Sequence, residues 1–216
     1  MFLNLWSRGF KDTRVVIVKS TSVASRIAPS LLGMTAKSRA VYLNVRLETY
    51  LATHLANSNM PDDIGVFAPL RSARLTAMLE APPRPAQSRG EVIAQAWLTE
   101  RLNQQTTQNA GGDRVLAVDF DQMLADAAQA LSRITSHLGL KAGQGAIARL
   151  VRSPAFSHYS KAPERREFSP SDRTAKLERA LTDHAAEVAK AKSFLAQIAG
   201  QNANVAALMQ NQTWSA

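Results

Sequence analysis

Basic and hydroxyl side chains follow an apolar run near the start of the sequence, where they could bind a phosphate or sulfate group. The tetrapeptide Lys19, Ser20, Thr21, Ser22 comes directly after the run Val15–Val18. Backbone amides at the start of a helix, together with hydroxyls and a lysine, can hold an anion. The same residues also suit an ordinary Ser/Thr helix cap beside an exposed lysine, and the segment has no glycine that would let the backbone approach a ligand closely.

A second candidate anion site lies at the end of the run Val41–Val45. Arg46 follows this run, and Thr53 comes seven residues later, about two helical turns into the next expected helix and on the side of Arg46. A guanidinium forks onto two oxygens, so that an arginine with a helix hydroxyl can clamp a phosphate. The alternative is that both side chains simply face solvent.

Two carboxylates flank Phe120 after a third apolar run, Val115–Val118. Asp119 and Asp121 point to one side if the strand continues, which would suit acid/base chemistry or a metal. The favoured alternative is that one of them caps the helix that follows.

The segment from His158 to Glu164 is polar, and we expect Tyr159, Ser160 and Lys161 to bind a sugar or a phosphate there. Metal binding is not expected, because the four histidines are far apart and the sequence has no cysteine. The sequence also contains no Walker-type phosphate loop, dinucleotide-binding glycine motif, nucleophile elbow or zinc-protease motif.

The three apolar runs are typical of strands that are covered on both faces. Helical patterns alternate with these runs, which predicts an α/β fold with a small parallel sheet of about three strands and flanking helices. The expected helices cover residues 23–31 (with a kink or split at Pro29), 47–55, 70–79, 92–102, 124–138 and 169–200. The proline-rich segment 81–90 between two of them is expected to be a mobile surface loop.

Length and composition favour one globular domain with an anionic partner. The 216 residues carry 26 lysines and arginines against 17 acidic residues, a formal net charge of +9. The apolar stretch at the N-terminus is too short for a signal peptide or a membrane span, so we expect a soluble, cytoplasmic protein without membrane association. The expected division is an N-terminal segment 1–13, an α/β domain 14–200 and a C-terminal tail 201–216.

Several of these stretches, taken in order, resemble a bacterial sulfotransferase-like family. They are VVIVKSTSVASRIAPSLL, VYLNVRLETYLATHLA, the helix around Trp97, RVLAVDFDQMLADAAQALSRITSHLGL, and HYSKAPE followed by a capped helix. The resemblance spans about residues 14–200. It implies a P-loop-type sulfotransferase fold that binds 3′-phosphoadenosine 5′-phosphosulfate as its donor cofactor and transfers the sulfuryl group to a hydroxyl or amine.

Two departures from the family pattern concern the donor site. The family's first strand and phosphate loop have no counterpart before Arg14, since Lys19 lies in what matches the following strand. The arginine that grips the 3′-phosphate corresponds to Val45, with Arg46 one residue away, while Thr53 matches the family's helix hydroxyl. We therefore expect a partial domain with a nucleotide-type anionic ligand and little or no transferase activity.

The competing interpretation is a non-enzymatic basic module that binds nucleic acid or an acidic protein. The low aromatic content of 6% and the absence of a basic helix argue against nucleic acid. The sequence does not indicate an acceptor or an oligomeric state.

Overall fold

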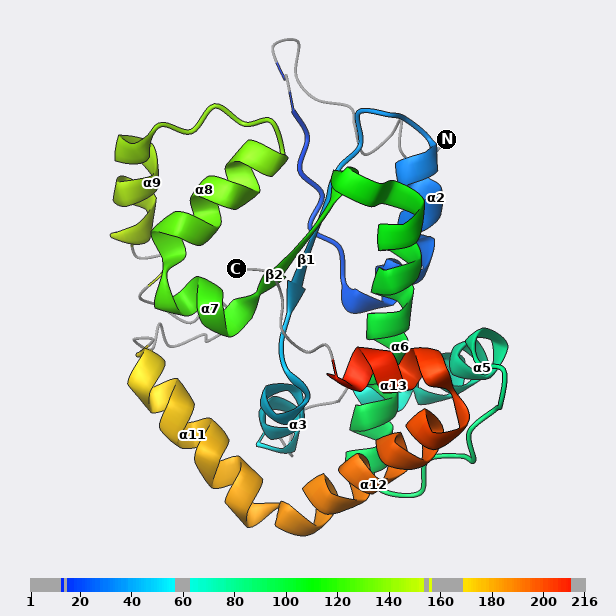
Figure 1. Cartoon of the computed structure of the whole chain (residues 1–216). Helices are drawn as coiled ribbons and strands as arrows, with labels where there is room; N and C mark the ends of the chain where they lie inside the picture. Colours follow the sequence, from blue (N-terminus) through cyan, green and yellow to red (C-terminus); the bar gives the residue numbers. More distant parts are fainter. Residues whose placement is uncertain (1–12, 14, 57–62, 154–155, 157–168, 211–216) are drawn as a thin grey trace.

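The computed structural model describes residues 13, 15–56, 63–153, 156 and 169–210 (Figure 1). The first half of the chain contains η1 (Ser22–Ile27), α2 (Ala28–Gly33), β1 (Ala40–Asn44), α3 (Leu47–Leu55), α4 (Asp63–Val66), α5 (Ala68–Met78) and α6 (Arg89–Gly111). The second half contains η2 (Gly112–Arg114), β2 (Val115–Asp119), α7 (Phe120–Ala125), α8 (Ala127–His137), α9 (Gln144–Val151), α11 (Pro170–Asp183), α12 (Ala185–Gln201) and α13 (Ala203–Gln210).

The fold is α/β, with β1 and β2 paired in parallel from Ala40 opposite Val115 to Asn44 opposite Asp119. The expected sheet of about three strands has two strands in the described residues. Val15–Val18 form no strand, which corrects the sequence interpretation. A β-branched run becomes a strand only where a neighbouring backbone pairs with it, and these four side chains are instead 39–66% exposed.

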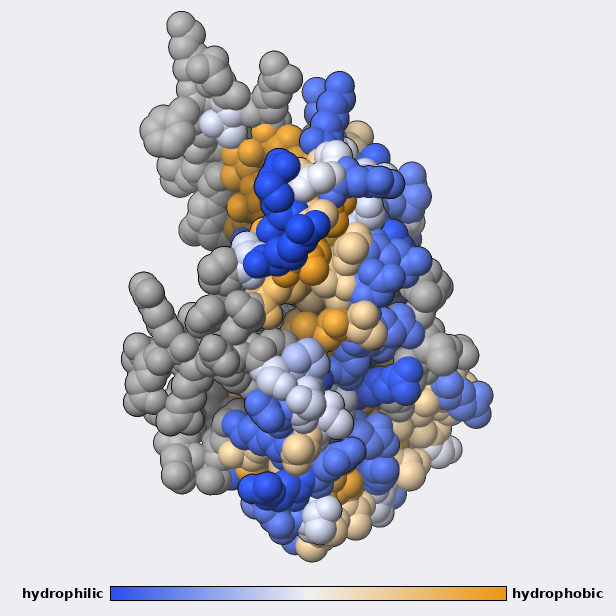
Figure 2. Space-filling model, turned by 90° about the vertical axis from the view of Figure 1, so that its left-hand side faces the viewer, coloured by the Kyte–Doolittle hydropathy of each residue, from blue (hydrophilic) through white to orange (hydrophobic). Residues whose placement is uncertain are grey.

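The sheet is also incompletely covered on its faces. Leu43 is 56% exposed, although it lies inside β1. Apolar surface gathers in the upper half of the face shown in Figure 2, the side of the molecule that carries α8 and α9 in Figure 1. Parallel strands are normally buried on both faces, so the exposure of Leu43 shows that one face of β1 is not fully covered.

The core is built around α6, a helix of 23 residues that begins at a Ser88 cap accepting from the backbone amide of Glu91. α2, α3, α5 and α12 pack against it. Its apolar side chains Ile93, Trp97 and Leu98 are buried. Polar residues of the same helix are buried as well, namely Gln95, Thr99, Asn103, Gln104 and Thr107. From Gly90 to Gln104 the helix is therefore enclosed on nearly all sides, which explains why its sequence shows no clear apolar stripe there.

The helix expected at residues 124–138 is broken near its start, and the helix expected at residues 169–200 is broken near its middle. Asp126 separates α7 from α8, and its side chain accepts from the amide of Gln129, because a short acidic side chain competes for helix amides. His184 separates α11 from α12. The predicted start of α11 is confirmed, since Ser169 accepts from the amide of Asp172 and Pro170 is the first helical residue.

The C-terminal segment and the proline-rich loop are both attached to the core. Where a tail was expected, α13 packs on α12 and buries Val205 completely. Asn202 accepts from the amide of Ala81 at 3.2 Å. Arg84 donates to both carboxylate oxygens of Glu91, at 2.9 and 2.7 Å. These bonds fix both ends of the loop that was expected to be mobile.

Candidate functional site

The carboxyl ends of β1 and β2 bring together polar side chains from separate parts of the chain. Asn44 and Asp119 are register partners in the last rung of the ladder. Partners in a parallel pair project to the same side of the sheet, and Arg46, two residues after Asn44 along an extended backbone, projects there too. This edge is where open α/β sheets place their ligands.

Asp119 holds both the start of α7 and the side chain of Arg46. Its Oδ1 accepts from the amides of Asp121 and Gln122, at 2.8 and 3.0 Å. Its Oδ2 lies 3.8 Å from Nε of Arg46. The side chain of Asp119 is 1% exposed, whereas that of Arg46 is 52% exposed. The cap that the sequence favoured for one of the two aspartates is therefore confirmed for Asp119.

Apart from Oδ1 of Asp121, which is in an ion pair with Arg173, two buried polar atoms at this edge make no hydrogen bond in the part of the chain that the structure describes. They are Nδ2 of Asn44 and Oδ2 of Asp119, one donor and one acceptor on adjacent strands. Leaving a buried donor or acceptor without a hydrogen bond costs about 1–3 kcal/mol, more for a charged group. Such atoms in a folded protein call for a partner, such as a water or a ligand group.

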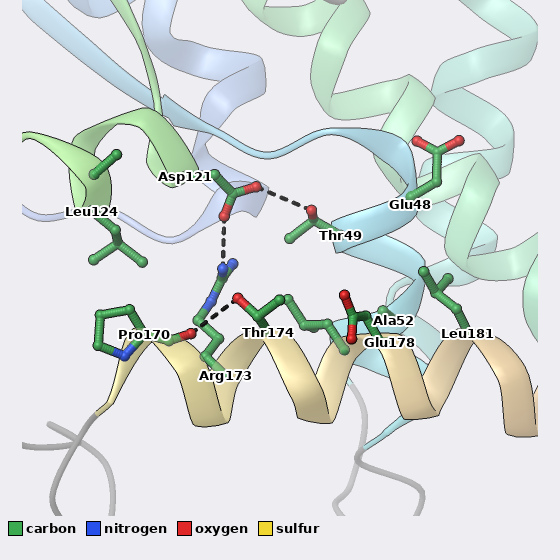
Figure 3. A pocket seen from close by; sticks show the side chains of 12 residues that line it. Glu48, Thr49, Ala52, Asp121, Leu124, Pro170, Arg173, Thr174, Glu178 and Leu181 are labelled. Carbon is green, nitrogen blue, oxygen red and sulfur yellow. Dashed lines mark hydrogen bonds and ion pairs between the residues drawn. The ribbon is translucent and has the colours of Figure 1, made fainter.

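Asp121 joins three helices beside this edge (Figure 3). Its Oδ2 accepts from the hydroxyl of Thr49 on α3 at 3.1 Å, and its Oδ1 lies 2.7 Å from Nη1 of Arg173 on α11. The guanidinium of Arg173 also lies over the ring of Phe120, 5.3 Å from its centroid. The carboxylate thus couples α11 to the start of α7 and to α3.

A cavity of about 380 Å³ lies between α3, α7 and α11. The close view shows Asp121 facing Arg173, with Glu178 further along α11 (Figure 3). Glu48, Asp121 and Glu178 contribute three carboxylates against the single guanidinium of Arg173. Partial burial raises the pKa of Glu48, but the hydrogen bond and charge of Lys192 outweigh it and the pKa is lowered overall. The cavity therefore carries a negative charge near neutral pH and disfavours a phosphate.

The structure places only part of the predicted site at this edge. Arg46 lies there as expected. Thr53 is exposed on α3, does not line the cavity, and donates its hydroxyl hydrogen to the carbonyl of Thr49 at 2.7 Å. The α3 hydroxyl that reaches the site is instead that of Thr49, one helical turn earlier.

The other predicted residues are separate from it. Lys19, Ser20 and Thr21 are exposed in a segment without regular structure, because the strand expected before them does not form. Ser22 begins η1, and Thr21, the residue before this short helix, makes no side-chain cap bond. Tyr159, Ser160 and Lys161 lie outside the described residues.

Sequence patterns did not identify Asn44, Thr49 or Arg173 as site residues. Asn44 carried a usable signal, since it is a polar residue at the end of an otherwise apolar strand. Thr49 resembles any other hydroxyl on an amphipathic helix. Arg173 reaches Asp121 from a helix about fifty residues later, and only tertiary packing brings the two together.

Within the described ranges, no group of three or more His, Cys, Asp or Glu side chains is arranged to hold a metal ion. In the same part of the chain, no helix has both the length and the apolar character needed to cross a membrane. Comparisons with protein-family models, with curated proteins and with solved structures give no match to this chain.

Proposed function

We propose that this chain is a sulfotransferase-like domain that binds a nucleotide-type anionic ligand at the carboxyl edge of its sheet. The observation that carries the proposal is the exposed guanidinium of Arg46, oriented by the buried carboxylate of Asp119 at the ends of two parallel strands. This is the edge where the family resemblance also expects the 3′-phosphate of 3′-phosphoadenosine 5′-phosphosulfate.

Arg46 is suited to bind a phosphate. Its contact with Asp119, at 3.8 Å, is an ion pair longer than a hydrogen bond, and no side-chain hydrogen bond of Arg46 occurs among the described residues, although its charge helps to lower the pKa of Glu48. A guanidinium has five N–H donors in a planar fork that matches two phosphate oxygens. The carboxylate of Asp119 restricts the positions of the Arg46 guanidinium, so that less side-chain conformational entropy is lost when a phosphate binds.

The neighbouring cavity suits a different part of a ligand. Its three carboxylates repel a phosphate but accept hydrogen bonds from amino or hydroxyl groups. We therefore assign the phosphate to Arg46 and an uncharged or cationic group to the cavity. A nucleotide carries both kinds of group.

Binding without efficient transfer is the activity that we assign to the chain. In-line transfer of a sulfuryl group needs several hydrogen-bond donors fixed around the transferred group. Electrostatic stabilisation by such donors is usually the largest contribution to catalysis. Among the cationic side chains described near the edge, Arg173 is already paired with Asp121 and Lys192 with Glu48, which leaves Arg46 as the half-exposed guanidinium.

Calorimetric titration with adenosine 3′,5′-bisphosphate tests the proposal. Arg46→Ala should weaken binding about tenfold or more, since a charge-assisted bond is lost. Arg39→Ala is the matched control, because Arg39 is an exposed arginine just before β1, at the opposite end of the strand. Both variants lower the net charge by one. No binding by the unaltered chain, or equal loss in both variants, would contradict the proposal.

The same pair of variants separates this proposal from the basic-module alternative. A surface that binds polyanions through net charge loses similar affinity from either substitution, and its affinity falls steeply with salt. A specific phosphate site loses affinity only with Arg46. Titrating a single-stranded oligonucleotide at two salt concentrations completes the comparison.

A further inference from the structure

At the carboxyl edge, Nδ2 of Asn44 and Oδ2 of Asp119 are buried without a hydrogen bond on adjacent strands. Oδ1 of Asp121 also has no hydrogen bond, but it lies 2.7 Å from the guanidinium of Arg173. The side chains of Asn44 and Asp119 are more than nine-tenths buried. They are register partners, so they project from adjacent strands to the same side of the sheet. One offers a hydrogen and the other accepts one.

A hydroxyl group satisfies both atoms at once. It donates its hydrogen to a carboxylate oxygen and accepts a hydrogen from an amide through a lone pair. A phosphate oxygen would be repelled by Asp119, and an ammonium group would leave the amide of Asn44 without an acceptor. Among common ligand groups, a hydroxyl thus fits this pair best.

Arg46 defines where such a hydroxyl must lie relative to a phosphate. Its Nε is 3.8 Å from the same Oδ2 of Asp119. An anion that draws this half-exposed side chain toward itself also uncovers Oδ2. A phosphate on Arg46 and a hydroxyl on Asp119 would then be close neighbours, as they are on adjacent carbons of a sugar.

We propose that Asn44 and Asp119 recognise a hydroxyl adjacent to the phosphate that Arg46 binds, so that the site selects a ribose 3′-phosphate over its 2′-deoxy form. The inference rests on the proposed function and adds to it the sugar that the ligand carries. Asn44 and Asp119 act here as specificity residues, through direct contact with the 2′-hydroxyl.

The test compares adenosine 3′,5′-bisphosphate with 2′-deoxyadenosine 3′,5′-bisphosphate by calorimetry on the unaltered chain. The two ligands have the same charge and base. The deoxy ligand should bind about tenfold more weakly or worse, because it leaves both buried atoms without partners. Equal affinity for the two ligands overturns this inference and leaves the proposed function standing. No binding of either ligand overturns both.

Two isosteric variants sharpen the result. Asp119→Asn keeps the Oδ1 cap of α7 but replaces the charged acceptor Oδ2 by an amide donor, so the preference for ribose should fall, because the 2′-hydroxyl loses its charge-assisted acceptor, while the deoxy ligand binds at least as well as before. Asn44→Leu removes the buried donor, and it should raise the melting temperature while reducing the preference for ribose. A lower melting temperature for Asn44→Leu with the preference unchanged would instead show that Asn44 has a structural role, held by a resident water.

Discussion

The backbones of Gly90 and Glu187 lie in direct contact where α6 and α12 cross, so that a Cβ atom at position 90 would lie 2.1 Å from the carbonyl oxygen of Glu187. The side chain of Glu187 returns to the same place, and its Oε2 accepts from the amide of Gly90 at 2.7 Å. An amide in the first turn of a helix has no partner within the helix, so this carboxylate supplies one. The crossing of α6 and α12 thus depends on the absence of a side chain at Gly90 and on the carboxylate of Glu187.

Gly90→Ala should destabilise the protein by about 2–3 kcal/mol, because the contact is with backbone atoms that cannot rotate away. Gly200→Ala is the matched control in α12, where an added Cβ meets nothing within 4 Å. Without a clash, alanine in a helix should stabilise by about 0.5–1 kcal/mol. Urea denaturation of both variants measures the difference, and similar midpoints would contradict the close crossing.

The carboxylate of Glu187 makes stability depend on pH. Its hydrogen bonds with Lys190 and with the amide of Gly90 lower its pKa from 4.5 to about 2. A lowered pKa in the folded state means that the stabilisation is fully present above pH 4.5 and is lost as the pH falls toward 2. Glu187→Gln should therefore cost about 1 kcal/mol at neutral pH, since part of the side chain is screened by solvent, and little at pH 2.

Thermal melts of Glu187→Gln between pH 2 and 7 measure this dependence. Glu80→Gln serves as the comparison, because Glu80 is exposed and no ion pair of it occurs in the described residues. A constant difference between the unaltered chain and Glu187→Gln over the whole pH range would show that the carboxylate does not contribute in its charged form.

How well the sequence predicts this fold depends on whether a signal is local. The helix Leu47–Leu55 and the cap Ser169 were predicted as observed, since periodicity and capping are properties of neighbouring residues. Pro29 splits its helix as expected, with η1 ending just before α2 begins. The breaks at Asp126 and His184 were missed, because the apolar pattern continues across them.

Val15–Val18 was the clearest error, and its cause is physical. Strand propensity describes how well a side chain suits a pleated, half-buried surface. It does not say whether a pairing backbone is present. The same limit applies to the site, where Arg46 and Asp119 stood at predictable strand ends, while Thr49 and Arg173 depend on how α3 and α11 pack.

The unpaired run offers a direct test of solubility. Ile17 is 66% exposed, so Ile17→Lys should change the free energy of unfolding by less than about 0.5 kcal/mol and reduce association of the protein. Leu195→Ala, at a fully buried position, should cost about 2–5 kcal/mol. Light scattering during concentration, together with urea denaturation, distinguishes the two effects. A large loss of stability in Ile17→Lys would indicate that the run is packed.

Arg173 should control the attachment of α11. Arg173→Met removes the ion pair to Asp121 and the contact with the ring of Phe120, so the backbone amides of α11 should exchange hydrogen faster. Arg179→Met, an exposed position on the same helix, is the control. Hydrogen exchange followed by mass spectrometry measures the protection of α11 in both variants. Unchanged protection of α11 in Arg173→Met would show that the apolar contacts alone hold it.

Because most of α6 is enclosed, few substitutions in this helix can be accepted during evolution. Gln104 and Thr107 are as inaccessible as Leu98, although their side chains are polar. Thr107 shares a hydrogen bond of 2.9 Å with the hydroxyl of Tyr42 on β1. A substitution at such a position must be matched by a second one elsewhere, so change along this helix is expected to occur in coupled pairs. Relatives of the chain would then keep the shape of α6 while losing its hydropathy pattern, and a search guided by apolar periodicity would pass over the central element of the fold.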